Sequence, residues 1–148
     1  EAEVIVVDNA STDDTKKIAL ELGAAVYDKG PERSAQRNLG WQKSRGEWVI
    51  VLDADMIIPP ETGEGVLSVT QGDAYWIPEV RTGSGFRVKA RNFERSFYDG
   101  TCVDALRLFR KGILEKTGGY DENLIAGPED WELDIRVLAT GAKCAEMR

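Results

Sequence analysis

The sequence predicts an α/β fold, in which strands of a parallel sheet are linked by crossover helices. Residues 4–27 show the order strand, helix, strand, which implies a parallel pair because the helix carries the chain back to the starting edge. The four apolar residues 49–52 form a run typical of a buried strand. Acidic residues directly follow both apolar strands, at the ends where open α/β sheets bind ligands. We therefore expect the functional site at the carboxyl ends of the strands.

Length and composition fit one globular domain with a substantial core. The chain has 148 residues, 42% of them hydrophobic and 30% charged. Its net charge of −7 argues against a nucleic-acid partner, which would require a basic surface. No apolar stretch approaches the roughly 18 residues of a membrane span, and no signal peptide is visible. We expect residues 1–148 to be a single domain cut at both ends, because a strand begins almost at once and few residues follow the last helix.

The cysteine and histidine content restricts the chemistry. The chain contains no His, which excludes Ser-His-Asp and Cys-His mechanisms and leaves a carboxylate, Lys, Tyr or Cys as general base. Cys102 and Cys144 are too few and too far apart for a zinc site or a disulfide framework. This low cysteine content favours a reducing compartment. We therefore expect a cytoplasmic location, either free or at the inner face of the membrane.

Local patterns place the elements of the first half in order. Ser11 begins a segment close to a capping box, and Gly23 ends the helix that follows. Ser34 is expected to cap the next helix, which Gly46 closes. The expected elements are a strand at 4–7, a helix at 11–22, a strand at 24–27, a helix at 34–44, a strand at 49–52, a helix at 61–70 and a strand at 74–80.

Residues 81–105 form a basic segment in an otherwise acidic chain. Ala90, Phe93 and Phe97 fall at helical spacing, which predicts an amphipathic helix within this segment. The basic residues are Arg81, Arg87, Lys89, Arg91 and Arg95. They are either the solvated face of that helix or a surface that contacts phosphate or another anion, for which Arg offers a bidentate fork.

The last third of the chain predicts a strand at 106–109, a helix at 112–117 and a closing helix from about Pro128. Apolar residues of the closing helix recur at i, i+4, i+7, i+8 and i+11, which predicts its buried stripe. They are Trp131, Ile135, Leu138, Ala139 and Ala142.

Asp53 and Asp55 are candidate metal ligands at the end of the strand at 49–52. Two hard oxygen ligands at a strand end suit Mg²⁺ or Mn²⁺ that holds a substrate diphosphate. The alternative is that both acids cap the turn leading into Pro59 and Pro60. Spacing alone leaves the two interpretations open.

Four segments, taken together, resemble the family-2 glycosyltransferases of GT-A fold. They are VIVVDNASTDDT at 4–15, RNLGWQKSRGEWVIVLDADM at 37–56, GGYDE at 118–122 and PEDWELDIR at 128–136. Each is weak alone, but their order and separation match the family, and with the intervening strands they cover nearly the whole chain. The resemblance implies a Rossmann-like mixed sheet flanked by helices, with a donor-nucleotide half at 1–80 and an acceptor half at 81–148. It also implies a strand before residue 1 and a further segment after residue 148.

The activity that the resemblance implies is transfer of a sugar from a nucleotide-diphospho-sugar to an acceptor hydroxyl, with inversion at the anomeric carbon. Asp8 and Asn9 fall where the family commonly has two consecutive acids near the nucleotide base. Asn9 departs from that pattern, but an amide can pair with a uracil or guanine edge, so a UDP- or GDP-type donor is implied. Arg37 and Asn38 match the family's Arg-Asn pair that faces the donor. From the residues alone, they would be a solvated charge and an ordinary surface amide.

The resemblance also assigns the reaction centre. Asp53 would lie near the donor's ribose or a metal-bound water, and Asp55 would bind Mn²⁺ or Mg²⁺ directly, so that the metal stabilises the departing diphosphate. Asp130 matches the proposed general base, which takes the proton of the attacking acceptor hydroxyl. Glu129 would position the acceptor, a saccharide or a lipid-linked molecule. Trp131 either stacks against a sugar or packs in the core. Without the resemblance, Glu129 and Asp130 would be ordinary acids of a first helical turn that complement the helix dipole.

Two rival functions stay open at this point. A haloacid-dehalogenase-like phosphatase also has an apolar strand followed by Asp-x-Asp, with Asp53 as nucleophile and Asp55 as acid. Its motif normally opens the fold, however, and Ile57 replaces the small or hydroxyl residue expected there. The other rival is a non-catalytic nucleotide-sugar-binding domain that retains the fold.

Overall fold

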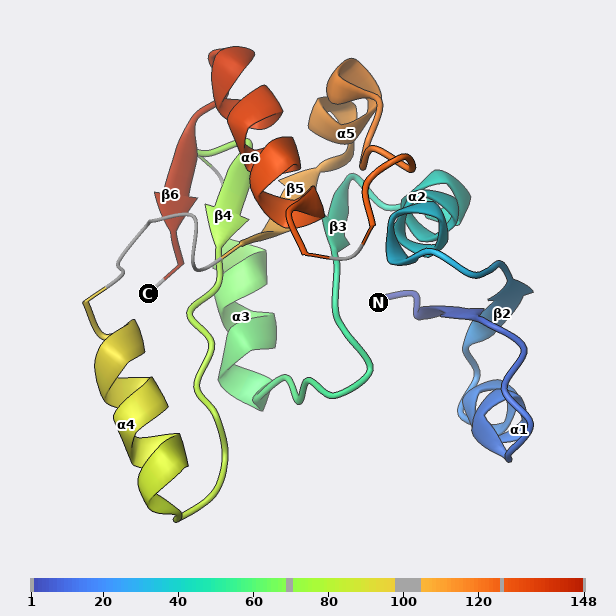
Figure 1. The fold of residues 1–148 in the computed structure, drawn as a ribbon. Helices are drawn as coiled ribbons and strands as arrows, with labels where there is room; N and C mark the ends of the chain where they lie inside the picture. Colours follow the sequence, from blue (N-terminus) through green and yellow to red (C-terminus); the bar gives the residue numbers. More distant parts are fainter. Residues whose placement is uncertain (1, 69–70, 98–104, 126, 148) are drawn as a thin grey trace.

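The protein has an α/β architecture, seen in a computed structural model that describes residues 2–68, 71–97, 105–125 and 127–147 (Figure 1). Strands and helices alternate through α4, as predicted. The elements are β1 (Ile5–Asp8), α1 (Thr15–Glu21), β2 (Ala25–Asp28), α2 (Arg33–Lys43), β3 (Trp48–Ile50), α3 (Pro60–Ser68), β4 (Ala74–Trp76), α4 (Phe86–Arg95), β5 (Leu106–Arg110), α5 (Lys111–Thr117), α6 (Glu129–Ala139) and β6 (Cys144–Glu146).

The described strands form two sheets. β1 and β2 pair in parallel, with Ile5 opposite Ala25, which confirms the crossover predicted for this segment. The second sheet has the order β3-β5-β4-β6, in which β5 runs antiparallel to β3 and β4 while β6 is parallel to β4. This sheet is mixed, as the GT-A resemblance implies, and not purely parallel. β6 was not predicted, because its sequence Cys-Ala-Glu has no run of β-branched or aromatic residues.

The main core lies between the four-stranded sheet and helices α5 and α6 (Figure 1). Phe109 of β5, Leu114 of α5 and Val137 of α6 are fully buried in one cluster. Burying a side chain of this size contributes about 1.5–3 kcal/mol. The cluster holds α6 against the sheet and so fixes where the acidic start of α6 lies relative to the end of β3.

The apolar run at 49–52 is a half-buried edge strand. β3 pairs with β5 alone among the described strands. Val49 and Val51 are buried, whereas Leu52 is 45% exposed. The predicted burial is therefore confirmed for Val49 and Val51 and wrong for Leu52, because only the face toward the core is covered.

The buried face of α6 is not the apolar stripe predicted for it. Trp131, Ile135 and Leu138 are all between 47% and 68% exposed. The buried residues of α6 are Glu129, Leu133, Asp134 and Val137. Both carboxylates on this face have polar partners, and a buried acid is tolerated when it is paired. Apolar periodicity alone therefore selected the wrong side of the helix.

Two helix starts also differ from the prediction. α1 begins at Thr15 with Asp14 as its N-cap residue, and Ser11 lies outside the helix, where its N–H donates to Asp8 Oδ2 at 2.9 Å. α2 begins at Arg33, so Ser34 lies buried in its first turn and does not cap it. Both helices therefore begin at a residue other than the one that the capping pattern indicated.

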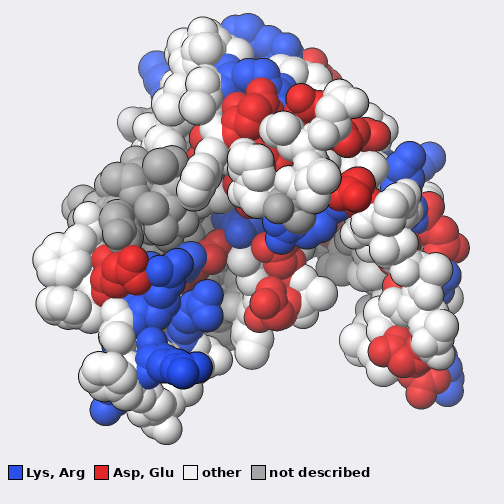
Figure 2. All heavy atoms as spheres, viewed as in Figure 1, with Lys and Arg blue, Asp and Glu red and all other residues white. Residues whose placement is uncertain are grey.

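The basic segment contains α4, at the lower left of Figure 1. Lys and Arg side chains gather over α4 in the same part of Figure 2. The predicted helix is confirmed, but Phe86 and Phe93 are exposed and no residue of α4 is buried, so its apolar side covers no core in the part of the chain that the structure describes. Residues 98–104, with Cys102, lie outside the described part of the segment. Within the described ranges, no helix is long and apolar enough to cross a membrane.

Candidate active site

Arg37 of α2 joins residues from three separate parts of the chain. Its Nη2 donates to Asp53 Oδ1, just beyond β3, and its Nη1 donates to Asp130 Oδ1, in the first turn of α6, both at 2.7 Å. The guanidinium also lies over the ring of Tyr120, 5.1 Å from the ring centroid. The Arg37 side chain is 7% exposed. We refer to these four residues as the central network, and three of them were predicted from the sequence as site residues.

The two carboxylates bonded to Arg37 have pKa values shifted in opposite directions. Burial would raise the pKa of Asp53, but the hydrogen bond and charge of Arg37 and the charge of Arg107 outweigh it, so this pKa is lowered. Burial also acts on Asp130, where it outweighs Arg37 and Arg107, so this pKa is raised. Asp130 is therefore the stronger base of the two. Neighbouring carboxylates whose pKa values are shifted in opposite directions are typical of active sites.

Glu129 fixes the start of α6 against α2. Its side chain is completely buried, and its Oε1 accepts hydrogen bonds from Arg33 Nη2 at 2.5 Å and from Arg37 Nη1 at 3.5 Å. Its Oε2 accepts the Gly127 N–H. Burial would raise the pKa of Glu129, but the bonded N–H and the two arginines lower it, so the group is ionised. Since both oxygens are bonded within the protein, the expected contact with an acceptor stays a prediction.

Asn38 holds the GGYDE loop and is not an exposed surface amide, since it is 4% exposed. Its Nδ2 donates to the Tyr120 carbonyl at 2.8 Å and to Glu122 Oε1 at 2.9 Å. Its Oδ1 accepts the Tyr120 N–H at 2.8 Å and Trp41 Nε1–H at 3.0 Å. An amide side chain has two N–H donors and an oxygen with two lone pairs, so all its hydrogen-bonding groups are used. The predicted contact of Asn38 with a donor would require one of these bonds to break.

Asp8 and Asn9 follow the end of β1. Asp8 Oδ2 accepts the Ser11 N–H at 2.9 Å and lies 3.4 Å from Lys16 Nζ. Hydrogen bonding by Ser11 lowers the pKa of Asp8, so this carboxylate is ionised. Asn9 is exposed, and its Oδ1 lies where a Cβ on Gly30 would meet it at 1.9 Å. No bond between described residues joins this pair to the central network, and its contact with a nucleotide base stays a prediction.

Arg107 of β5 reaches the same place, although sequence reasoning missed it. The residue is 6% exposed. Its Nη2 lies 3.4 Å from Asp53 Oδ2, and its Nε donates to Glu79 Oε1 at 2.9 Å. Burial would lower the pKa of Arg107, but the charges of Glu79, Asp53 and Asp130 raise it. A signal was present in the sequence, because a single Arg interrupts the apolar residues 105–109, and a charge within a buried strand is rare unless it is paired.

A family model described as glycosyl transferase family 2 matches residues 1–118. The chain belongs to glycosyl transferase family 2. The matched region includes Arg37 and Asp53 and ends before Asp130 in α6. A TPR repeat-containing protein of Synechococcus elongatus is 44% identical over 55 residues, which are 36% of this chain and 14% of that protein.

Solved structures place the family-2 chain within a shared fold. S. aureus TarS (residues 1–349) has a TM-score of 0.72 at 20% identity, with 97% of this chain and 48% of that chain covered. Glucosyl-3-phosphoglycerate synthase from Mycobacterium tuberculosis, in complex with phosphoglyceric acid, has a TM-score of 0.66 at 18% identity, with 97% and 57% covered. The same enzyme with Mn²⁺, uridine-diphosphate and glucosyl-3-phosphoglycerate has a TM-score of 0.63 at 19% identity, with 98% and 58% covered. These likenesses confirm the GT-A fold, and the chain spans about half the length of each neighbour.

The predicted metal ligands of this family-2 chain are not part of a preformed cluster. Asp55 is exposed and has no hydrogen bond or ion pair to another described residue, whereas Asp53 is bonded to two arginines. In the ranges described above, no group of three or more His, Cys, Asp or Glu is placed to hold an ion. An ion that arrives with a diphosphate needs only one or two carboxylates, because phosphate oxygens and waters complete its shell. The two aspartates fit such an ion.

The alternative that these acids cap the following turn is not supported by the bonding. The turn is closed by the main chain, since the Met56 N–H donates to the Asp53 carbonyl at 3.1 Å. Neither carboxylate bonds a backbone N–H of the described residues. Both side chains therefore remain available for a ligand, apart from the two arginine contacts of Asp53.

Trp131 follows Asp130 in the first turn of α6. Trp131 is 47% exposed, so the alternative that it packs in the core was wrong. Its stacking against a sugar stays a prediction.

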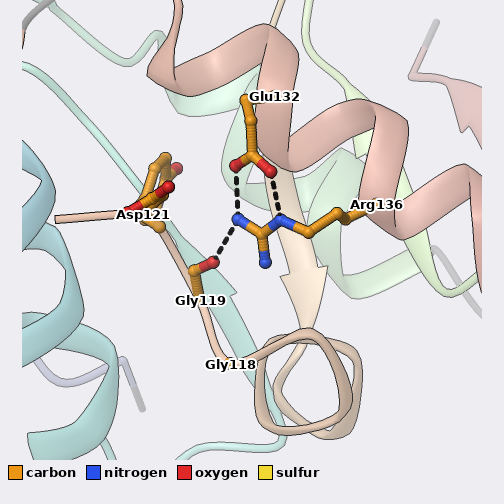
Figure 3. Close-up of a pocket in the computed structure, with 6 residues that line it drawn as sticks. Gly118, Gly119, Asp121, Glu132 and Arg136 are labelled. Carbon is orange, nitrogen blue, oxygen red and sulfur yellow. Dashed lines mark hydrogen bonds and ion pairs between the residues drawn. The ribbon is translucent and has the colours of Figure 1, made fainter. Parts of the chain in front are cut away.

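A cavity of about 300 Å³ lies beside the GGYDE loop and is lined by Gly118, Gly119, Tyr120, Asp121, Glu132 and Arg136 (Figure 3). Figure 3 shows the Arg136 guanidinium between the Glu132 carboxylate and the Gly119 carbonyl. Arg136 Nη2 donates to both, at 2.6 Å and 2.7 Å, and Nη1 donates to the Thr117 carbonyl at 2.6 Å. The charges lining this cavity thus hold the loop to α6.

Proposed function

We propose that the protein transfers a sugar from a nucleotide-diphospho-sugar to an acceptor hydroxyl, with inversion at the anomeric carbon. The observation that carries the proposal is that Arg37 bonds both Asp53 and Asp130, so the donor-side acid and the acid of the Glu-Asp motif meet at one guanidinium. Family membership and the uridine-diphosphate complex of a structural neighbour support a UDP- or GDP-type donor. Because the chain spans about half of its neighbours, the proposal concerns the whole protein.

Asp130 is the proposed general base. In a single displacement, the acceptor oxygen attacks the anomeric carbon while the bond from that carbon to the diphosphate oxygen breaks, and the hydroxyl proton passes to the Asp130 carboxylate. Burial raises the pKa of Asp130 and makes it a stronger base than an exposed carboxylate. The charges of Arg37 and Arg107 limit that rise and so favour the proton-accepting form.

Asp55, together with Asp53, is proposed to hold Mn²⁺ or Mg²⁺ against the donor diphosphate. When bound, such an ion supplies positive charge that stabilises the departing nucleoside diphosphate. The neighbour solved with Mn²⁺ and uridine-diphosphate supports this role. Asp55 has no described partner to give up, whereas Asp53 would exchange an arginine contact for the ion.

The other assignments follow from the resemblance and stay proposals. Asp8 and Asn9 would contact the nucleotide base, Arg37 and Asn38 the donor, and Glu129 and Trp131 a saccharide or lipid-linked acceptor. Residues 1–80 and 81–148 would be the donor and acceptor halves, and the location would be cytoplasmic. Family membership argues against the haloacid-dehalogenase-like phosphatase. Substitution of Asp130 separates a transferase from a non-catalytic binding domain, because only a transferase would lose sugar transfer while it still binds the donor.

Thermal unfolding with UDP-, GDP- and dTDP-sugars, with and without Mn²⁺, tests the proposed donor. A donor at 100 times its Kd should stabilise the fold by about 2.7 kcal/mol, which is roughly 5–11 °C for a chain of this size. Asp55→Ala should abolish the Mn²⁺-dependent part of the shift. The matched control Asp14→Ala, an exposed acid with no side-chain cap bond, should retain it. No shift with any donor, or a full shift in Asp55→Ala, would contradict the proposal.

A further inference from the structure

Arg107 carries a buried donor atom that no described residue satisfies. Its side chain is 8% exposed, and its Nη1 is buried without a hydrogen-bond partner in the described ranges. Its other two nitrogens face acids, with Nε 2.9 Å from Glu79 Oε1 and Nη2 3.4 Å from Asp53 Oδ2. Leaving a buried N–H of a charged group unpaired is costly, so native proteins rarely do so without a reason.

Neither of these two acids has Arg107 as its only arginine. Asp53 already has Arg37, whose bond of 2.7 Å is shorter than the 3.4 Å contact from Arg107. Glu79 already has Arg95 at 3.1 Å. Each acid therefore has another arginine, so Arg107 is not the sole partner of either acid.

The unpaired atom belongs to a residue at the proposed reaction centre. Arg37 takes one oxygen of Asp53 and Arg107 takes the other, so the two guanidinium groups lie on either side of one carboxylate. Asp130 and Arg107 are close enough for each charge to act on the other. A substrate that contacts Asp53 or Asp130 would therefore lie near Arg107.

We propose that Arg107 is a substrate-binding residue whose Nη1 donates to a negatively charged oxygen of the substrate. This inference rests on the proposed glycosyltransferase function and names a contact within that site. A planar guanidinium suits the task, because two of its nitrogens stay on protein acids while the third binds an anion. The charged oxygen comes either from the donor's diphosphate or from an acidic group of the acceptor.

Calorimetric titration of Arg107→Gln and Arg107→Lys tests the contact. The probes are UDP and GDP with Mn²⁺, the matching nucleosides uridine and guanosine, and inorganic phosphate added to the UDP–Mn²⁺ complex as a stand-in for an acidic acceptor group. The matched control is Arg110→Gln, on the same strand, whose side chain is 34% exposed and pairs with Glu47. Circular dichroism sets a temperature at which all variants are folded.

A diphosphate contact predicts that Arg107→Gln binds UDP at least tenfold more weakly while uridine binding is unchanged. An acceptor contact predicts unchanged UDP binding and phosphate binding weakened at least tenfold. Arg107→Lys keeps the charge but loses the fork, so it should lie between wild type and Arg107→Gln, and it carries the test if the glutamine variant does not fold. Arg110→Gln should match wild type throughout.

Wild-type binding of both UDP and phosphate by Arg107→Gln would overturn the inference while leaving the proposed function intact. An equal loss of UDP and uridine binding would overturn it too, because a distorted site, and not a lost anion contact, would explain that pattern. A wild type that binds neither UDP nor GDP and transfers no sugar would overturn the proposed function and this inference with it.

Discussion

Replacing Arg37 by Gln removes the side chain that holds both carboxylates of the central network. The change breaks two hydrogen bonds of 2.7 Å, in a place where the Arg37 side chain is 7% exposed. Asp53 keeps its contact with Arg107 at 3.4 Å. Asp130 keeps no hydrogen bond to a described residue, so its charge is left poorly compensated.

The expected loss of stability depends on how exposed the paired side chains are. Removing one partner of a buried ion pair costs about 3–5 kcal/mol. The side chains of Asp53 and Asp130 are 26% and 16% exposed, so water offsets part of the loss. We therefore expect about 3 kcal/mol, or a fall in Tm of about 6–12 °C. The control Arg45→Gln removes a side chain that is 86% exposed and pairs with Glu3, so it should leave the Tm nearly unchanged.

The same substitution should change the pH dependence of activity. Arg37 lowers the pKa of Asp130 against the effect of burial, so its loss should raise that pKa further. The acidic limb of kcat/KM should then move to higher pH, since the base must be ionised to accept a proton. Thermal unfolding by circular dichroism and a pH–rate profile measure the two effects. An Arg37→Gln protein with a Tm within about 2 °C of wild type and an unmoved acidic limb would refute the reasoning.

Two further predictions concern stability. The pKa values of Asp53 and Glu129 are lowered on folding, so the stability that they contribute is present above their ordinary pKa of about 4 and is lost as the pH falls through the folded values. Urea denaturation should show a lower free energy of unfolding at pH 3 than at pH 7, and equal values would count against this. Gly119→Ala should cost about 2 kcal/mol or more, since φ is +74° and the new Cβ would lie 2.4 Å from Asn38 Oδ1. Gly63→Ala, in α3 where a Cβ meets nothing within 4 Å, should instead gain about 0.5–1 kcal/mol, and the reverse order of Tm values would be inconsistent with the structure.

The central network could be predicted because its residues lie in ordered motifs. Arg37 and Asp53 belong to one segment that resembles the family, at 37–56, and Asp130 belongs to another, at 128–136. The fold brings a strand end and two helices together at those residues. The sequence could not show which polar groups the protein itself uses. Asn38 matches a donor-facing position, yet its amide is fully bonded to the loop and to Trp41.

The buried face of α6 could not be read from apolar spacing. Trp131 and Ile135 are exposed, while Glu129 is completely buried, because Arg33 and Arg37 reach across from α2 to neutralise it. Such a pairing depends on residues more than 90 positions apart, which no local pattern contains. Arg107 is the opposite case. Its charge within an apolar strand was visible in the sequence, but its partners become known only when the strands are paired.

The most direct test of the account is Asp130→Asn in the whole protein, with donor binding and transfer measured side by side. An amide oxygen can still accept the bond from Arg37 but cannot take up a proton. The matched control is Asp134→Asn, on the same helix, which can still accept the bond from Trp76. We predict that Asp130→Asn binds UDP or GDP with Mn²⁺ as wild type does, while the transfer rate falls by about 10²–10⁴-fold. Wild-type transfer by Asp130→Asn would show that the acceptor proton goes elsewhere.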